Sequence, residues 1–551
     1  MAKRSLSPAS LPEAKRTHTN LDGPLTSTIR RTFDNALYDE LILVIFSYLS
    51  WTDLCAIQAT NRNWCRLSQD NQLWKALYLN EYGRTRLRGG RGFYGRTDGR
   101  EVRPLPSRAR HEEDTRDWKW MFRISSNWRT GRCSIEQLSD VSTIPPPRNV
   151  LPPPPILAEV RVPGTHVLLA GDMIISASAR PSHAPEIALT MPNKSSKTLS
   201  CTSTRHRGPA GFTALAIDQS PPSSPHLVRL VGFLSTGEFT VFLLNHQSVS
   251  SSSRLMTYVP TTEGAPRTSP IIQAVYHHPL LVTLSKSFQL SLYDLSSDTI
   301  THTQTLSSFT SFPPSSLVLS SRGQSTYKLV LAYAIPVFPS HWSVGSTELI
   351  ISASSTSPTL GVTSSRTTRP FDLPSGWLDE EKMKAVREQW GRKVAHVADT
   401  QTDGKWVVLA PGEASLLQTS SADSSMATPY TSSSLHSPSF LQLYRLHLPQ
   451  SQSPTSMPRM TFVRNLRGQT GPVSALALAD GRCVSLGVNG SIWVWDLEAG
   501  TGAEVSSGYT ADEIEFMQSS HLSWEKGSIM FDDRRIVTAD SRGVQIRRFD
   551  V

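Results

Sequence analysis

Many short apolar runs follow residue 145, and they restrict the fold more than any other feature of the chain. Runs such as HVLLAGDMIISAS and VSALALADGRCVSLGVNGSIWVWDL are rich in Val, Leu, Ile and aromatic residues, and Gly, Ser, Pro and Asp separate them. Short strands joined by turns are typical of an all-β sandwich, barrel or propeller. Roughly 400 residues is too long for one sandwich but suits a propeller, whose blades of about 40 to 50 residues pack only on their neighbours. The sequence therefore predicts a propeller over residues 157–551.

Three segments interrupt the predicted strands. Asp379 and the two glutamates after it begin a helix near residues 378–396. Its apolar stripe consists of Met383, Val386, Trp390 and Val394. We expect this helix to cover a blade edge or the propeller rim, and a docking helix for a partner is the alternative. Ser-rich stretches at 250–253 and 415–439 are interpreted as disordered loops between strands.

A second, smaller unit of helices is predicted over residues 33–82. The run LILVIFSYLSWTDL, residues 41–54, is too short to cross a membrane and is more typical of a buried helix. Together with Leu37 before the run, Leu41, Val44, Ile45, Tyr48 and Leu49 form the apolar stripe of the first helix. Ser50 and Asp53 match a capping box, so a second helix is expected to begin there. Because about 45 residues of short helices make only a small core, we expect another protein to cover the stripe.

A basic linker, residues 83–156, joins the two predicted units and contains one more helix. From Arg84 to Arg132 there are 14 Lys or Arg against 6 Asp or Glu, so most of the net charge of +9 lies here. A protein that coats nucleic acid usually spreads its positive charge more widely. Residues 1–32 are polar and basic and are expected to form a disordered tail.

Several classes of protein and site are not expected. The five cysteines lie far apart without a C-x-x-C pair, which argues against a zinc site or a disulfide framework. No apolar run reaches about 18 residues, and the N-terminus lacks the apolar core of a signal peptide. We therefore expect a cytoplasmic and/or nuclear protein without membrane contact. P-loop, H-E-x-x-H, G-x-S-x-G and EF-hand patterns are absent from the sequence, so no enzyme, cofactor or metal is expected.

Residues 37–74, LYDELILVIFSYLSWTDLCAIQATNRNWCRLSQDNQLW, resemble an F-box, the helical module by which substrate receptors attach to the Skp-family adaptor of SCF ubiquitin ligases. The matching positions are Leu37, Asp39, Glu40, Leu41, Ile45, Phe46, Ser47, Tyr48, Leu49, Asp53, Leu54, Arg62, Trp64, Leu73 and Trp74. Tyr38 and Trp51 stand where the family usually has prolines. The resemblance implies these adaptor contacts: Leu37, Leu41, Ile45, Leu49 and Leu54. Trp64 and Trp74 are expected to hold the module's own helices together.

The C-terminal part resembles a WD-repeat propeller, for which seven blades are usual. The best unit is GQTGPVSALALADGRCVSLGVNGSIWVWDLEAG, residues 468–500, with a strand that ends in Trp495 and Asp496. Gln469 stands where the family has a histidine, so the hydrogen-bond network inside this blade is expected to be incomplete. Such rings commonly close when an N-terminal strand completes the last blade, and LAEVRV, residues 157–162, is the expected closing strand.

An F-box, a basic helical hinge and a propeller together resemble the F-box and WD-repeat substrate receptors, and NWRTGRC at 127–133 is typical of their junction. The resemblance implies a multidomain α and β protein that performs no covalent chemistry. Its implied partners are the adaptor, a cullin and a RING subunit bound through the adaptor, and a protein substrate, phosphorylated or not. The candidate substrate-binding residues are Arg534, Arg535, Arg542, Arg547 and Arg548, because arginines on a propeller face can bind phosphate.

The segment RLRGGRGFYGR in the linker suggests an alternative function. Arginine, glycine and aromatic residues in alternation can bind RNA through phosphate contacts and stacking. An RNA-binding or non-ligase scaffold protein that uses the linker and the propeller is therefore the alternative. A flexible basic linker explains the same residues without RNA, so nucleic acid is not the expected partner.

Overall fold

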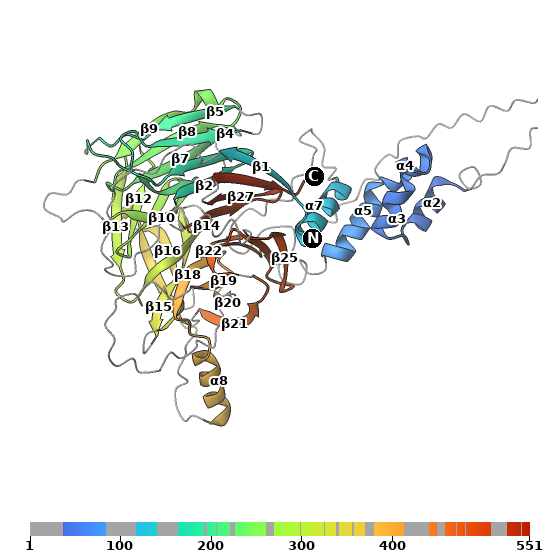
Figure 1. Cartoon of the computed structure of the whole chain (residues 1–551). Coiled ribbons are helices and arrows are strands. Elements are labelled where there is room, and N and C mark those ends of the chain that lie inside the picture. Colours follow the sequence, from blue (N-terminus) through green and yellow to red (C-terminus); the bar gives the residue numbers. More distant parts are fainter. Residues whose placement is uncertain are drawn as a thin grey trace, which may run out of the picture. The chain divides into compact units, whose positions relative to one another are not determined.

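A computed structural model gives the arrangement of the chain (Figure 1). It describes residues 37–83, 117–139, 164–191, 195–204, 207–220, 226–260, 269–297, 299–323, 325–337, 341–354, 357–369, 379–412, 440–448, 458–469, 471–479, 481–508, 526–540 and 543–551. The predicted tail at 1–32, the Arg-Gly segment and the Ser-rich stretch at 415–439 lie outside the described residues. The chain divides into two compact units, residues 1–76 and 77–551, and we describe each unit by itself.

The first unit is helical, as the apolar spacing predicts. Its helices are α2 (Asp39–Phe46), α3 (Trp51–Ile57), α4 (Arg62–Ser68) and α5 (Asn71–Tyr78), the last of which crosses the unit boundary. Ser50 caps α3 by accepting a hydrogen bond from the Asp53 backbone N–H at 3.3 Å, so the predicted start of this helix is confirmed. Asn61 caps α4 in the same way through the Trp64 N–H at 2.8 Å.

A small core holds these helices together. The fully or almost fully buried apolar side chains include Ile42, Phe46, Leu54, Leu67 and Trp74. Trp64 meets the Phe46 ring edge-on with centroids 5.7 Å apart, and the Trp74 Nε1–H donates to the Ser68 carbonyl at 2.7 Å. Both tryptophans therefore contact residues of the module's own helices, as the sequence predicts.

The second unit begins with a π-helical turn, η1 (Leu79–Gly83), and the linker helix α7 (Trp118–Thr130). Asp117 caps α7 through the Trp120 N–H at 3.0 Å. Gly131 ends the helix with a left-handed φ of 73°. A Cβ at Gly131 would clash with the carbonyl oxygen of Glu504 in β25 (Thr501–Ser506), so this close approach of the two backbones requires glycine.

In the described residues the rest of the unit forms seven antiparallel sheets of four strands each, which confirms a seven-bladed propeller (Figure 1). Blades 1 to 3 are β2 (Thr165–Ala170), β3 (Met173–Ser178), β4 (Glu186–Thr190), β5 (Ser196–Ser200); β6 (Phe212–Ile217), β7 (Leu227–Leu234), β8 (Phe239–Asn245), β9 (Ser253–Tyr258); and β10 (Ile271–His277), β11 (Leu280–Ser285), β12 (Gln289–Asp294), β13 (Thr301–Ser307). Blades 4 and 5 are β14 (Phe312–Gly323), β15 (Thr326–Val337), β16 (His341–Ser354), β17 (Ser357–Thr368); and β18 (His396–Thr402), β19 (Trp406–Gly412), β20 (Leu441–His447), β21 (Arg459–Leu466). Blades 6 and 7 are β22 (Val473–Ala479), β23 (Arg482–Gly487), β24 (Ile492–Asp496), β25 (Thr501–Ser506); and β26 (Ser528–Phe531), β27 (Arg535–Asp540), β28 (Gly543–Arg548) with β1 (Ser134–Ser139).

The strand that closes the ring is β1, and not the predicted segment 157–162, which lies outside the described residues. β1 pairs antiparallel with β28 and becomes the outermost strand of blade 7, with Ile135 opposite Arg547. The propeller therefore begins inside the region that the sequence assigned to the linker. An outer strand buries little surface, and SIEQLS is accordingly polar, with Ile135 62% exposed. Apolar patterning could not indicate this strand for that reason.

Three further details differ from the sequence-based expectations. The helix near 378–396 forms as α8 (Glu380–Trp390) and buries none of its own residues, with Met383 and Trp390 each 37% exposed. Val394, the last residue of the predicted stripe, lies beyond the helix, is 2% exposed and pairs with Trp342 of β16, so this residue and not the helix packs on a blade. The stretch 250–253 forms the end of a short 3₁₀ helix, η3 (Val249–Ser251), and the start of β9.

In blade 6, Trp495 Nε1–H donates to Ser485 Oγ, which donates to Gln469 Oε1. Gln469 thus replaces the histidine in the hydrogen-bond chain, although its own Nε2 has no partner among the described residues.

Candidate functional site

A row of exposed apolar side chains lies on the first unit, along α2 and the turn into α3. It consists of Tyr38, Leu41, Val44, Ile45, Tyr48 and Trp51, whose exposed fractions range from 42% to 85%. Ile42 and Phe46, on the opposite face of α2, are buried in the helical core. We call these six residues the apolar row. Scattered exposed apolar residues are ordinary, but six adjacent ones on one small unit indicate a surface that a partner covers.

The five residues proposed from the sequence for this contact have different positions. Leu41 and Ile45 are exposed members of the apolar row, and Leu37 and Leu49 are half-buried. Leu54 is fully buried, so its side chain belongs to the core of the unit and we do not retain it as a contact. Tyr38 and Trp51 were missed, although large apolar residues in place of the usual prolines were a signal for them.

Helix α7 is fixed to blade 7 by its Asn-Trp pair. The Asn127 side chain donates to the Phe549 carbonyl at 2.8 Å, and the Trp128 Nε1–H donates to the Asp533 carbonyl at 2.9 Å. On the other face of α7, Trp118 and Phe122 pack against Tyr78 and Tyr82, with ring centroids 5.4 and 5.3 Å apart. The NWRTGRC motif therefore joins the linker helix rigidly to the propeller.

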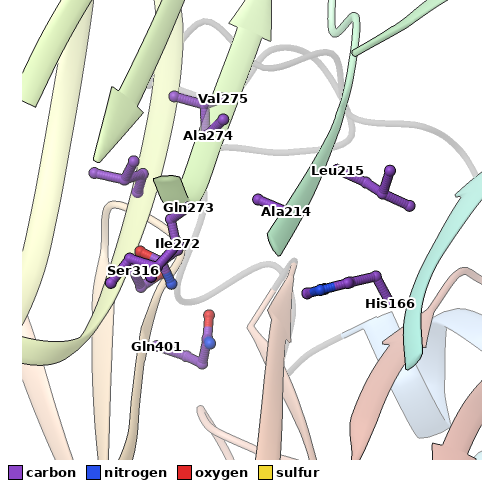
Figure 2. Close-up of a pocket in the computed structure, with 10 residues that line it drawn as sticks. His166, Ala214, Leu215, Ile272, Gln273, Ala274, Val275, Ser316 and Gln401 are labelled. Atoms are coloured by element: carbon purple, nitrogen blue, oxygen red, sulfur yellow. The ribbon is translucent and has the colours of Figure 1, made fainter. Parts of the chain in front are cut away.

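A cavity of about 190 Å³ lies in the propeller channel (Figure 2). Its described lining residues are His166, Ala214, Leu215, Ile272, Gln273, Ala274, Val275, Ser316, Leu317 and Gln401. They belong to β2, β6, β10, β14 and β18, the first strands of five successive blades, and these strands contact one another around the ring. The cavity therefore lies on the axis of the propeller.

The polar side chains of the cavity are held in place by neighbouring strands. Gln273 Oε1 accepts a hydrogen bond from Ser315 Oγ at 3.0 Å, and Ser316 Oγ accepts one from the Thr402 N–H at 3.2 Å. His166 Nε2 lies 3.2 Å from the Phe212 carbonyl oxygen. Desolvation lowers the pKa of His166 to about 4, against the opposing effect of that hydrogen bond, so the ring is neutral at pH 7. Sequence reasoning missed these residues, and their only signal was a polar residue inside an apolar strand.

The arginines proposed from the sequence for substrate binding are engaged within the propeller. Arg535 is 5% exposed and bonds Asp532 at 2.9 Å and the Asp172 carbonyl at 3.1 Å, so it links blade 7 to blade 1. Arg547 is also buried and donates to Thr538 and Gln545.

Of the other three arginines, Arg534 lies 3.7 Å from the Asp172 carboxylate, and Arg548 lies 3.4 Å from that of Glu136. Arg542 lies outside the described residues. Strand pairing turns Arg535 and Arg547 into the blade, so these two are not surface residues as the sequence suggested. Arg534, Arg535 and Arg548 line one small pocket together with Asp172 and Asp550.

Metal ligands and membrane spans are both missing from the part of the chain that the structure describes. No group of three or more His, Cys, Asp or Glu side chains there could hold a metal ion. His278 lies in a turn of blade 3, and its backbone N–H donates to the Asp218 carboxylate of blade 2 at 3.0 Å. This bond links two neighbouring blades. Among the described helices, none has the length and apolar character needed to span a membrane.

Comparison with known proteins identifies the family. A family model described as F-box protein pof12 beta-propeller matches residues 186–518, which is more than half of the chain. The chain belongs to this family. A second family model, F-box-like, matches residues 39–80, so the helices that carry the apolar row form an F-box-like domain. The closing strand β1 (Ser134–Ser139) precedes the first residue that the family model matches, Glu186.

One curated relative matches over a shorter length. This F-box protein of Saccharomyces cerevisiae is 28% identical over 123 residues, which are 20% of this chain and 19% of the yeast protein. The chain therefore spans about a fifth of the length of this relative. Among solved structures, the β-propeller domain of Myceliophteria thermophila Cps50 (Swd1) is 11% identical with a TM-score of 0.37, covering 71% of this chain and 98% of that one. The WD40 propeller domain of Doa1 is 10% identical with a TM-score of 0.34, covering 71% and 94%.

Proposed function

We propose that this pof12-family protein is the substrate-recognition subunit of an SCF-type E3 ubiquitin ligase. Its F-box-like domain binds a Skp-type adaptor, which connects it to a cullin and a RING subunit. Its propeller holds a target protein for ubiquitination and degradation. The chain performs no covalent chemistry itself, and we place its activity in the cytoplasm or the nucleus.

The observation that carries this proposal is the apolar row. Tyr48 is 85% exposed and Val44 55% exposed, although each is a large apolar side chain on a domain of the F-box-like type. Complete burial of a fully exposed side chain of this size is worth about 1.5–3 kcal/mol, and a half-exposed one contributes a proportionate part. Six neighbouring side chains form one apolar surface, and the F-box match supports a Skp-type adaptor as its partner.

The yeast relative is itself named an F-box protein, which supports the same conclusion for the matched part of the chain. The RNA-binding alternative rests on the Arg-Gly segment, which lies outside the described residues. No observation on the described residues favours it, so we retain a single proposed function.

Adaptor binding is tested with Ile45→Asp in the full chain and purified Skp-type adaptor. A charge within the apolar row would be buried without a partner in the complex, so binding should weaken by about 100-fold or more. Ile45 is 42% exposed, so the helices should remain folded, which circular dichroism checks. Gln72→Asp places the same charge on an exposed polar position of α5 and should bind like wild type. Equal binding by both variants would refute the proposal.

A further inference from the structure

The axial cavity contains two polar groups with unused hydrogen-bonding capacity. Gln401 lies on β18, and its side-chain amide makes no hydrogen bond to another described residue. His166 lies on β2 and donates its Nε2–H to the Phe212 carbonyl, so the neutral ring offers Nδ1 as an acceptor. Figure 2 shows both side chains extending toward the space between them. In the free protein water can serve these groups, but a partner that covers the channel must replace that water.

The wall of the cavity carries no charge among the described residues. Its lining has no Lys, Arg, Asp or Glu. Asp399, two residues before Gln401 on the same strand, accepts the Leu476 N–H at 2.8 Å and lies 3.8 Å from Lys526. This acidic group is therefore already paired. A phosphate or carboxylate in the cavity would lose its hydration without gaining a cation, and an ammonium or guanidinium group would lose it without gaining an anion, which is costly in free energy.

The size of the cavity suits a single side chain. Its volume is about 190 Å³. This volume is below the roughly 300 Å³ at which pockets for drug-sized ligands begin. An amide side chain offers both an N–H donor and a C=O acceptor, so it can form a reciprocal pair with Gln401 and donate to His166 Nδ1. A hydroxyl group can donate to His166 and accept from the Gln401 amide N–H, but it then leaves the Gln401 C=O without a donor, and an apolar side chain leaves both groups unpaired.

We infer that the axial cavity binds one uncharged amide side chain, Asn or Gln, that the target protein inserts into the propeller channel. This inference rests on the proposed function of the propeller as the part that holds the target. The inference defines the substrate class by an unmodified amide residue, whereas the sequence left open whether the substrate is phosphorylated.

The test uses the purified full chain and an array of peptides with randomised flanks. The central position is each of the twenty amino acids, phosphoserine, phosphothreonine or phosphotyrosine in turn. We expect peptides with central Asn or Gln to bind about tenfold more tightly than those with Ala, the size expected for one buried polar pair left unmade. Phosphorylated centres should bind no better than Ala.

Variants of Gln401 make the result specific to the cavity. Gln401→Leu should remove the preference for Asn and Gln, and Gln401→Lys should move it to Asp and Glu. Gln289→Leu is the matched control, because Gln289 is exposed on β12, the third strand of its blade, and should keep the wild-type preference. Thermal unfolding of each variant checks that the propeller remains intact.

Three outcomes would overturn the inference: a preference for any centre other than Asn or Gln, phosphorylated centres included, an Asn or Gln preference that survives Gln401→Leu, or no central preference at all. The last would mean that the cavity holds water only. The array contains no adaptor, so it is independent of the ligase proposal. A chain that selects Asn or Gln peptides but fails to bind adaptor would refute the proposed function and leave this inference standing.

Discussion

The indole ring of Trp128 stacks on the ring of Phe549, with centroids 4.0 Å apart and an interplanar angle of 13°. The two residues are separated by almost the whole propeller in sequence. Arg482 of blade 6 lies over the same indole at 5.1 Å from its centroid. This cluster joins the linker helix to the last and the preceding blade, and β1 begins four residues after α7 ends. The chain therefore passes directly from the helix that packs on blades 6 and 7 to the strand that closes the ring.

Trp128→Ala should destabilise the closed ring. Trp128 is 3% exposed, so the substitution removes a buried ring stack and a hydrogen bond, and the free energy of unfolding should fall by about 3–5 kcal/mol. Chemical denaturation followed by far-UV circular dichroism measures this change. Arg129→Ala is the control, because Arg129 is exposed and its ion pair with Glu81 should contribute less than about 1 kcal/mol. Similar losses for both variants would contradict the role assigned to Trp128.

The closing role of β1 is tested by Ile135→Pro with Glu136→Pro. Neighbouring residues of a strand direct their N–H groups to opposite sides, so two adjacent prolines remove at least one hydrogen bond to β28. Amide hydrogen exchange in residues 543–548 should then become faster. Ile135→Ser with Glu136→Ser keeps both N–H groups and should leave exchange nearly unchanged. If the proline variant retains full protection, another segment, such as 157–162, closes the ring.

His166 should make the stability of the propeller depend on pH. Its pKa is about 4 in the folded protein and about 6.5 when unfolded, so the unfolded state binds more protons between these values. Stability should therefore fall as pH decreases from 6.5 to 4, by up to about 1.4 kcal/mol per pH unit. Calorimetry of wild type and His166→Gln from about pH 7.5 to about pH 4.5 measures this change. The wild type should lose more stability than the variant, and a constant difference across the range would exclude this role of His166.

Periodicity in the sequence was sufficient to predict the helices of the F-box-like domain. The apolar residues of α2 recur at helical spacing, and the box formed by Ser50 and Asp53 places the start of α3 correctly. The same spacing could not distinguish Leu41 from Leu54, because both are apolar residues on a short helix. Only the packed helices show that Leu54 faces the core and that Leu41 is exposed.

The sequence by itself determined that the chain has a small helical domain and a large propeller, because turn residues and apolar spacing act locally. The tertiary structure alone decided which polar segments complete these parts. β1 is polar and becomes a strand only because β28 offers it an unpaired edge. Arg535 and Arg547 look like surface charges in sequence, but strand pairing and blade packing bury them and supply their partners. Hydrogen bonds and burial between residues hundreds of positions apart therefore closed the ring and defined its axial cavity.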